Sequence, residues 1–143
     1  MRRIFSVLLS LVIGLSCMVL ASATTFAETN EPPPQLRMLY IGGTETLISI
    51  SGSNAICVGS LTGYQGVTTK VEITLTLQSK LSSSSTWTNF YCHPKQTFND
   101  FRGTVSVSTG IVKGYQYRTM VVYTAYSGTK YETLTQYSGV ATY

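Results

Sequence analysis

Residues 71–78 place the strongest constraint on the fold of this chain. Their sequence, VEITLTLQ, alternates strictly between apolar and polar side chains, which puts every apolar group on one face of an extended strand. A strand with one apolar and one polar face is typical of antiparallel sheets. Parallel sheets instead favour continuous apolar runs and crossover helices. The segment therefore predicts an antiparallel sheet with one buried side.

The chain beyond residue 38 continues in the same β-type composition. It is rich in Thr, Ser, Tyr, Val and Gly, which suits strands and turns better than helices. Further strands are predicted between turn signals at 45–51, 55–61, 87–92, 104–112, 115–126 and 131–140. Residues 52–54 and 127–129 read as the turns of two hairpins. About seven strands predict an all-β, immunoglobulin-like antiparallel sandwich, with a small barrel as the alternative.

The first residues of the chain have the pattern of a secretory signal peptide. Arg2 and Arg3 precede an apolar run at 5–21, and small residues follow it. Cleavage is predicted after Ala27, with Ala23 as the alternative. A retained membrane anchor would need roughly 20 apolar residues, and this run is slightly shorter. The prediction is residues 1–27 as signal peptide and a secreted, extracellular protein with no stable membrane span after cleavage.

Two parts remain after cleavage. Residues 28–37 form a Pro-rich leader, since three consecutive prolines fix φ and remove backbone donors. Residues 38–143 are long enough for a single domain with a real core. The mature chain has eight basic and six acidic residues, a net charge of +2, and the basic residues are scattered singly. Nucleic-acid binding needs a concentrated basic patch, so no nucleic-acid partner is predicted.

The mature chain has two cysteines, Cys57 and Cys92. In an exported chain an even pair suggests a disulfide. A bridge between them would close a loop of about 36 residues and contribute roughly 3–4 kcal/mol in the chain-entropy model. The competing interpretation is two unpaired thiols, because a bridge also requires a suitable separation of the two backbones.

The adjacent residues Cys92 and His93 raise the question of a catalytic or metal site. Neighbouring side chains on one strand point to opposite faces, which argues against a Cys–His pair. Zinc needs three or four converging ligands, and a Ser–His–Asp site would have to use His93 and Asp100 without a G-x-S-x-G turn. The carboxylates occupy positions expected to face solvent: Glu45, Glu72, Asp100 and Glu132. No enzymatic activity, cofactor or metal site is predicted, and His93 is expected at the surface where a strand ends.

Aromatic residues are the other notable feature. Trp87 and Tyr117 are expected in the core, and the segment 114–117 resembles the tyrosine corner of immunoglobulin domains. Ten tyrosines exceed what so small a core can hold, so some should form an exposed surface able to stack on sugars or anchor a protein partner. The predicted aromatic binding surface consists of Tyr115, Tyr123, Tyr126 and Tyr131.

Several of these residues fit a pattern known from other chains. The chain resembles a family of small secreted proteins of clostridia and related Firmicutes, in which a strand ending L-Q-K is followed by a Ser/Gly turn with Trp and a later G-Y-x-Y-R strand. The matching residues are Leu77, Gln78, Lys80, Trp87, Gly114, Tyr115, Tyr117 and Arg118. The likeness spans residues 48–138 and departs at Ser79, which intervenes before Lys80. The resemblance implies secretion and an immunoglobulin-like fold, and because that family has no assigned function it implies no catalytic residue.

Two functions are consistent with the sequence. The first is a non-enzymatic extracellular binding or cell-envelope module whose partner is an extracellular protein or glycan. The second is a secreted effector, either antimicrobial or a small hydrolase. Export, the β-sandwich pattern and the surplus of tyrosines favour the first.

Overall fold

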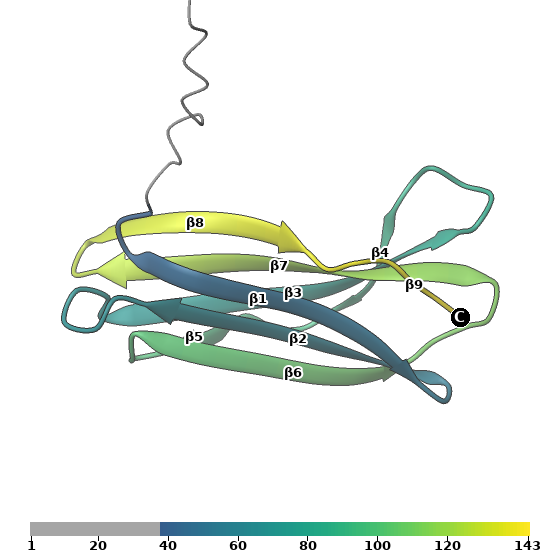
Figure 1. Cartoon of the computed structure of the whole chain (residues 1–143), viewed down its shortest axis with the longest axis horizontal. Coiled ribbons are helices and arrows are strands. Elements are labelled where there is room, and N and C mark those ends of the chain that lie inside the picture. The colour runs from purple at the N-terminus through teal and green to yellow at the C-terminus, as the bar shows by residue number, and fades with distance from the viewer. Residues whose placement is uncertain (1–37) are drawn as a thin grey trace, which may run out of the picture. The chain divides into compact units, whose positions relative to one another are not determined.

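Nine strands and no helix make up the chain over residues 38–143, which are the residues that this computed structural model describes (Figure 1). The predicted signal peptide and leader lie outside the described residues. The strands are β1 (Ile41–Ser51), β2 (Asn54–Gly63), β3 (Lys70–Leu81), β4 (Thr88–Cys92), β5 (Gln96–Phe98), β6 (Arg102–Gly110), β7 (Tyr115–Ser127), β8 (Lys130–Tyr137) and β9 (Ala141–Thr142). Within residues 38–143 no helix is long and apolar enough to cross a membrane.

The strands form two antiparallel sheets that pack face to face. The three-stranded sheet has the order β1-β2-β6, and the six-stranded sheet has β3 and β7 at its centre. In the six-stranded sheet, β4 and β5 both pair with β3, while β8 and β9 both pair with β7. This order corresponds to strands A-B-E and C′-C-F-G of immunoglobulin-like domains. The predicted all-β sandwich is confirmed.

The strand count differs from the predicted seven because both outer strands of the six-stranded sheet are interrupted. Pro94 cannot donate a backbone hydrogen bond, and it separates β4 from β5 along the edge of β3. Residues 138–140 separate β8 from β9 along β7. The two additional strands, β5 and β9, lie just beyond the predicted strands 87–92 and 131–140.

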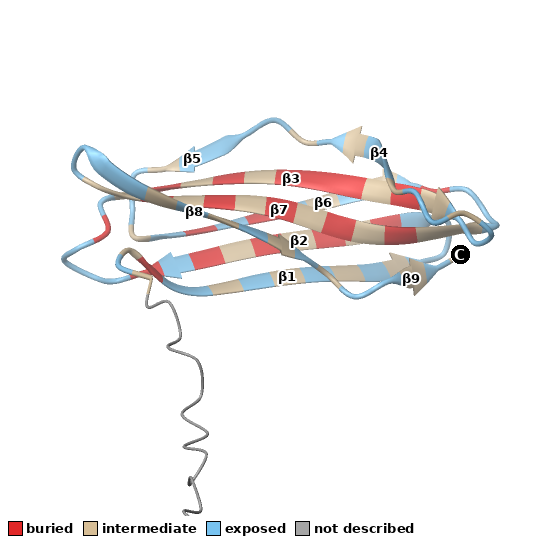
Figure 2. Cartoon of the chain, turned by 90° about the horizontal axis from the view of Figure 1, so that it is seen from above, coloured by how far each residue is buried: buried red, intermediate tan, exposed pale blue. Residues whose placement is uncertain are grey.

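Alternation along the central strands builds the core (Figure 2). The side chains of Val71, Ile73, Leu75 and Leu77 on β3 are all fully buried, as their period of two predicts. They face the opposing sheet together with inward residues of β7 and β2: Tyr117, Val121, Tyr123, Ala125, Ala55, Cys57 and Leu61. Figure 2 shows the resulting alternation of buried and half-buried positions along β3 and β7.

Both predicted hairpin turns are present and both place glycine at the first of two turn residues. Gly52 connects β1 to β2 with φ of 58°, and Gly128 connects β7 to β8 with φ of 61°. A residue with a side chain adopts this left-handed conformation at a cost, which glycine avoids. Two-residue turns of this type match the twist of the paired strands and so fix the register of each hairpin.

A tyrosine corner joins β7 to the loop that precedes it. The Tyr117 hydroxyl accepts a hydrogen bond from the Val112 N–H (2.8 Å) and donates one to the Val112 carbonyl (2.9 Å). Gly114, with φ of 88°, turns the chain between these two residues. The location matches the sequence prediction and the arrangement found in immunoglobulin-like domains.

Side chains of the six-stranded sheet reach across to the backbone of β1. The Thr119 hydroxyl donates to the Leu47 carbonyl (3.1 Å), and the Tyr123 hydroxyl donates to the Glu45 carbonyl (2.6 Å). Glu132 on β8 does the same with its carboxylate, which accepts hydrogen bonds from three successive backbone N–H groups: those of Leu39, Tyr40 and Ile41. Glu132 was expected to face solvent, but it ties the start of β1 to β8.

The two cysteines are free thiols and do not form the hypothesised bridge. Cys57 lies on β2 with its side chain fully buried between the sheets. Cys92 pairs with Thr76, which alternates with the inward Leu75 and Leu77, so Cys92 is exposed on the far side of the six-stranded sheet. The sheet therefore stands between the two sulfur atoms. Burial raises the pKa of the Cys57 thiol, against the opposing effect of a hydrogen bond to Thr119, and keeps it in its less reactive protonated form.

The prediction that Trp87 fills the core is wrong. Trp87 lies in the connection between β3 and β4, half-buried and outside the core cluster. The ring that contacts the buried Tyr117 from this segment is Phe90, edge-on at 5.6 Å between ring centroids. Phe90 occupies an irregular position in the pairing of β4 with β3, and this bulge changes the alternation on which the prediction depended.

Candidate functional site

The outward side of the six-stranded sheet brings together several aromatic and cationic side chains that lie outside the core. We call this side the outer face. It consists of the residues that alternate with the buried positions on the three long strands: Lys70, Glu72, Thr74, Thr76, Gln78 and Lys80 of β3, Arg118, Met120, Val122, Thr124 and Tyr126 of β7, and Tyr131, Thr133, Thr135 and Tyr137 of β8.

Only half of the predicted aromatic surface is on the outer face. Tyr126 and Tyr131 are directly paired across β7 and β8, with ring centroids 5.6 Å apart. Tyr123 is fully buried, and this burial raises the pKa of its hydroxyl despite the hydrogen bond to Thr46. Tyr115 also points inward, half-buried, with its ring 6.4 Å from that of Tyr117. Tyr123 and Tyr115 are therefore removed from the candidate surface.

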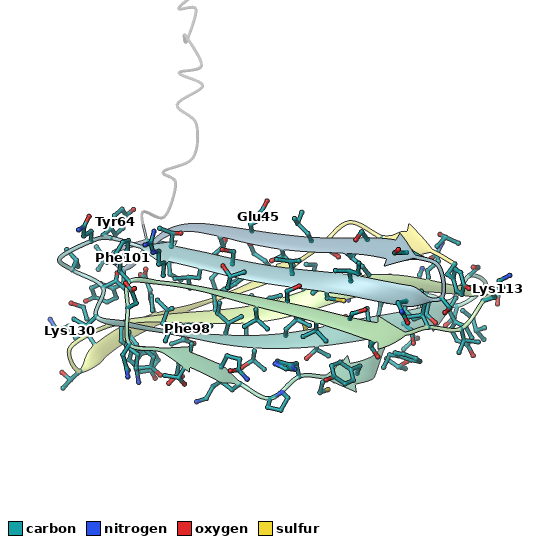
Figure 3. All side chains as sticks on the ribbon, turned by 90° about the horizontal axis from the view of Figure 1, so that it is seen from below. Glu45, Tyr64, Phe98, Phe101, Lys113 and Lys130 are labelled. Atoms are coloured by element: carbon teal, nitrogen blue, oxygen red, sulfur yellow. The ribbon has the colours of Figure 1, made fainter. Side chains whose placement is uncertain are left out.

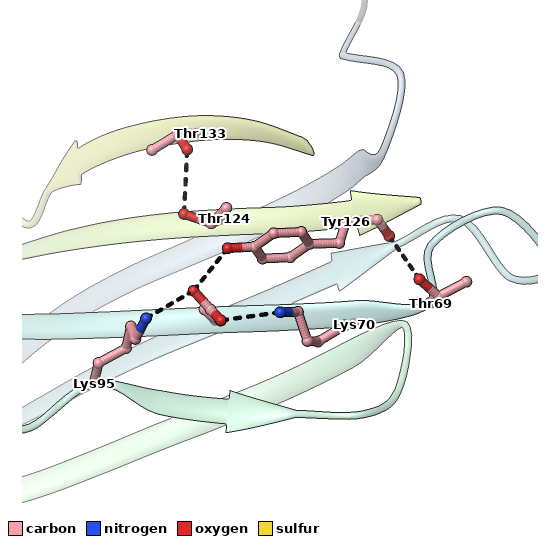
Figure 4. Close-up of polar contacts among 7 residues, drawn as sticks. Thr69, Lys70, Lys95, Thr124, Tyr126 and Thr133 are labelled. Carbon is pink, nitrogen blue, oxygen red and sulfur yellow. Dashed lines mark hydrogen bonds and ion pairs between the residues drawn. The ribbon is translucent and has the colours of Figure 1, made fainter. Parts of the chain in front are cut away.

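At one end of the outer face, Glu72 is the centre of a polar network (Figure 4). Its carboxylate accepts hydrogen bonds from Lys70 (3.2 Å), Lys95 (3.1 Å) and the Tyr126 hydroxyl (3.0 Å). The ammonium group of Lys70 also lies 3.7 Å from the centroid of the Tyr126 ring. We call Lys70, Glu72, Lys95, Tyr126 and Tyr131 the tyrosine end.

The network sets the charge state of the groups at the tyrosine end. Partial burial alone would raise the pKa of Glu72, but the hydrogen bonds from Lys95, Tyr126 and Lys70 outweigh it and hold that pKa below its ordinary value. The pKa of Tyr126 is raised, chiefly because its hydroxyl donates to this carboxylate. The two lysines and the carboxylate thus satisfy one another.

We expect Glu72→Gln to lower the free energy of unfolding by about 1 kcal/mol at neutral pH, because the variant leaves two lysines without their counter-charge. A folded-state pKa below the unfolded value of about 4.3 means that Glu72 contributes its full stabilisation above that value. The stabilisation disappears as the pH falls through the folded-state pKa. Urea denaturation of both proteins between pH 7 and pH 3 should therefore show a gap that narrows below about pH 4.

The exposed Glu45 on β1 provides the control for this measurement. Glu45→Gln should leave both the stability and its dependence on acid nearly unchanged, because neither ion pair found among residues 38–143 includes Glu45. A Glu72→Gln gap of constant size down to pH 3 would contradict the role given to the network.

The other end of the outer face has an arginine between aromatic rings. The Arg118 guanidinium carbon lies 4.4 Å from the centroid of the Trp87 ring and 4.3 Å from that of Tyr137. The Lys80 ammonium lies 5.2 Å from the same Trp87 ring. Distances of this size allow cation–π attraction between each cation and the rings. We call Lys80, Trp87, Arg118 and Tyr137 the Trp87 cluster.

Two amide side chains support the Trp87 cluster. Arg118 Nε donates to Gln78 Oε1 (2.9 Å), and Gln78 Nε2 donates to Asn89 Oδ1 (3.0 Å). Arg118 and Gln78 are directly opposed in the pairing of β7 with β3. The arginine is therefore oriented by a hydrogen bond as well as by the rings.

The outer face has a charge excess that the linear sequence conceals. It collects Lys70, Lys80 and Arg118, with Lys95 beside them, against the single carboxylate of Glu72. Both ion pairs found among residues 38–143 use Glu72, so neither Lys80 nor Arg118 has a carboxylate partner in that part of the chain. The basic residues are far apart in the sequence because Lys70 and Lys80 lie at opposite ends of β3, Lys95 lies between β4 and β5, and Arg118 lies on β7. The fold brings four of them to one face.

Cys92 and His93 do not form a site. The His93 ring lies on the side of β4 occupied by Tyr91, with 6.4 Å between the ring centroids, whereas Cys92 faces outward. His93 Nδ1 is buried and has no hydrogen-bond partner among residues 38–143. Over residues 38–143 no group of three His, Cys, Asp or Glu side chains is arranged to hold a metal ion.

A shallow hollow on the three-stranded sheet is a weaker candidate than the outer face. It is lined by Gly43, Thr44, Glu45, Ser60 and Thr62 and has a volume of about 220 Å³. Pockets for small organic ligands usually enclose roughly 300–1,000 Å³ and are mostly apolar. Figure 3 shows that Glu45, its single charged residue, points away from the sandwich. The hollow is too small and too open to surround such a ligand.

Comparisons with known proteins do not assign the chain to a family. No protein-family model and no curated protein matches it. It is similar to the crystal structure of Spo0M, a sporulation control protein from Bacillus subtilis, at 6% sequence identity and a TM-score of 0.39. The match covers 71% of this chain and 49% of that one, so the chain spans about half the length of that protein. A likeness this distant has no bearing on function, and the resemblance to the clostridial family stays a prediction.

Proposed function

We propose that this protein is a secreted, non-enzymatic binding module that contacts its ligand with the outer face of the six-stranded sheet. The observation that supports this most directly is the exposure of aromatic rings at both ends of that face. Tyr131 is 65% exposed at the tyrosine end, and Tyr137 is 51% exposed in the Trp87 cluster. Exposed rings beside oriented cations are typical of surfaces that bind glycans or proteins.

The other parts of the proposal have separate support. Secretion rests on the signal peptide predicted for residues 1–27, and the intact mass of protein recovered from culture medium would identify the cleaved bond. The non-enzymatic character rests on the divergence of Cys92 and His93 and on the inert state of the buried Cys57 thiol. No specific observation on residues 38–143 favours the alternative of a secreted effector.

Binding to intact bacterial cells, peptidoglycan and purified glycans tests the proposal. We expect Tyr137→Ala to weaken binding about tenfold or more, as truncation of an interface aromatic commonly does. Sedimentation of labelled protein with each material would measure the affinity. Leu47→Ala is the matched control, because Leu47 is similarly exposed (48%) but lies on the opposite sheet. Equal binding by the wild-type protein and Tyr137→Ala would contradict the assignment of the outer face.

A further inference from the structure

Arg118 is held at both sides by rings from different parts of the sheet. Trp87 belongs to the connection between β3 and β4, whereas Tyr137 belongs to β8, on the other side of β7. The guanidinium carbon lies at nearly the same distance from both rings, 4.4 Å and 4.3 Å. Guanidinium is weakly hydrated and stacks well on aromatic faces, so this position is favourable for arginine and less so for lysine.

Most hydrogen-bonding capacity of this guanidinium is unused. Of its five N–H donors, one at Nε is bonded to Gln78. Its two terminal nitrogens have no hydrogen-bond or ion-pair partner among residues 38–143. Because Gln78 is itself held by Asn89, the guanidinium is fixed at its inner nitrogen while its terminal fork stays available.

The charge around Arg118 favours an anion. Lys80 adds a second cation next to the same Trp87 ring, and the carboxylate of the outer face, Glu72, is engaged by Lys70 and Lys95 at the tyrosine end. Two cations beside each other with no local acid create a positive potential that attracts anionic ligands. A bound carboxylate would reduce the repulsion between Lys80 and Arg118. It would also accept hydrogen bonds from the unused N–H donors of Arg118.

The surroundings of the cluster indicate the kind of molecule that brings the anion. Between the two ends the outer face presents the hydroxyls of Thr74, Thr124, Thr133 and Thr135 beside the apolar side chains of Met120 and Val122. Amide groups of Gln78 and Asn89 lie beside the arginine, and Tyr137 presents an exposed ring. Hydroxyl, amide and aromatic groups on a sheet surface suit the hydroxyls and the apolar ring faces of sugars.

We propose that the Trp87 cluster binds the carboxylate group of an acidic, uronic-acid-containing glycan. The inference rests on the proposed function and specifies its ligand class. The terminal nitrogens of Arg118 hold the carboxylate with two parallel hydrogen bonds, and Lys80 supplies a second positive charge. The two oxygens of a planar carboxylate match the planar fork of the Arg118 guanidinium. The neighbouring sugar ring stacks on Tyr137.

The cluster contains its own optical reporter, because Trp87 is the single tryptophan of the chain. We expect titration with polygalacturonate to change the Trp87 fluorescence. Polygalacturonate whose carboxyl groups have been reduced to alcohols should bind at least tenfold more weakly, and poly(glycerol phosphate) should also bind more weakly than polygalacturonate. Affinity for polygalacturonate should fall with rising salt concentration, since the contact is between charges.

Substitutions test whether the Trp87 cluster is the site that binds polygalacturonate. Arg118→Gln should weaken polygalacturonate binding about tenfold, and Arg118→Lys should restore only part of it because lysine lacks the bidentate fork. Lys80→Gln removes the second charge without breaking the Arg118–Gln78 hydrogen bond, so it should weaken binding even if Arg118 variants are unstable. Lys130→Gln is the control, because Lys130 begins β8 and pairs with Ser127, at the opposite end of β7 from Arg118.

The outcomes separate this inference from the proposed function. Equal affinity for the native and the carboxyl-reduced polymer would overturn the carboxylate assignment while leaving a glycan-binding face. Tighter binding to poly(glycerol phosphate) would overturn it in favour of phosphate. If neither acidic polymer binds, the inference fails, and the comparison of Tyr137→Ala with Leu47→Ala on intact cells and peptidoglycan decides the proposed function independently.

Discussion

Replacement of Tyr117 by alanine is expected to lower the free energy of unfolding by about 3–5 kcal/mol, the usual cost of removing a large buried aromatic ring. Tyr117 is fully buried and, with Tyr123, has the largest side chain in the core. Its ring contacts that of Phe90 on β4. Its hydroxyl also closes the corner through both hydrogen-bonding groups of Val112. Small domains are stable by about 5–15 kcal/mol, so this variant approaches the unfolding limit. Urea denaturation followed by circular dichroism measures the change.

Tyr117→Phe separates the corner from the packing. It keeps the ring but leaves the N–H and carbonyl of Val112 without their partner, which should cost about 1–3 kcal/mol. Tyr115→Phe is the matched control on the same strand, because Tyr115 is only half-buried. If Tyr117→Phe is as stable as the wild-type protein, the corner hydrogen bonds make no net contribution.

Gly63→Ala is expected to destabilise the protein by about 2–4 kcal/mol although it adds a single methyl group. A Cβ atom at Gly63 would lie 2.4 Å from Thr68 Oγ1, closer than any real contact allows. That hydroxyl donates to the Tyr40 carbonyl (2.6 Å) and accepts from the Tyr64 N–H (3.0 Å), and Thr68 is buried. The methyl group can be accommodated only by moving Thr68 and breaking these bonds.

Gly43→Ala provides the comparison for Gly63→Ala. A Cβ atom at Gly43 would meet nothing within 4 Å, so this substitution should change stability by no more than about 0.5 kcal/mol. The double variant Gly63→Ala with Thr68→Ala should cost less than the sum of the two single changes, because the clash requires both side chains. Thermal or urea denaturation of the wild-type protein, the two single variants and the double variant would show this. If the two stability losses simply add, the steric explanation is wrong.

The fold was predictable from features that act locally. The strict alternation of residues 71–77 determined which side of β3 is buried, and Gly52 and Gly128 marked the two hairpins at their observed places. The position of Tyr117 after Gly114 indicated the corner. Each of these signals depends on the backbone within a few residues, so no knowledge of distant partners was needed.

Predictions that depended on distant partners succeeded less often. On β7 both parities contain apolar residues, Val121 and Ala125 on one side and Met120 and Val122 on the other. Alternation alone therefore could not decide whether Tyr123 or Tyr126 faces solvent, and the sheet opposite determines the answer. The proposed Cys57–Cys92 bridge failed for a similar reason, because which side of the edge strand Cys92 occupies depends on its pairing with Thr76.

The Trp87 cluster was beyond sequence reasoning. Its members come from β3, a connection, β7 and β8, and only the order of strands in the six-stranded sheet brings them together. The direct pairing of Gln78 with Arg118 follows from the register of β3 and β7, which no local pattern reveals. Parity offered one signal that could have been used: Gln78 and Lys80 have the opposite parity to the apolar Leu75 and Leu77 on β3.

The hydrogen bond between Glu132 and β1 also limits the pairing of this edge strand with other molecules. An edge strand presents unpaired backbone groups that can recruit a strand from another molecule, which begins aggregation in many β proteins. Glu132 already occupies one of these groups at the start of β1, because its carboxylate accepts a hydrogen bond from the Ile41 N–H. A second molecule could pair with this end of β1 only by displacing that carboxylate. The contact that joins β8 to the start of β1 thus also keeps this end of the edge strand from templating intermolecular assembly.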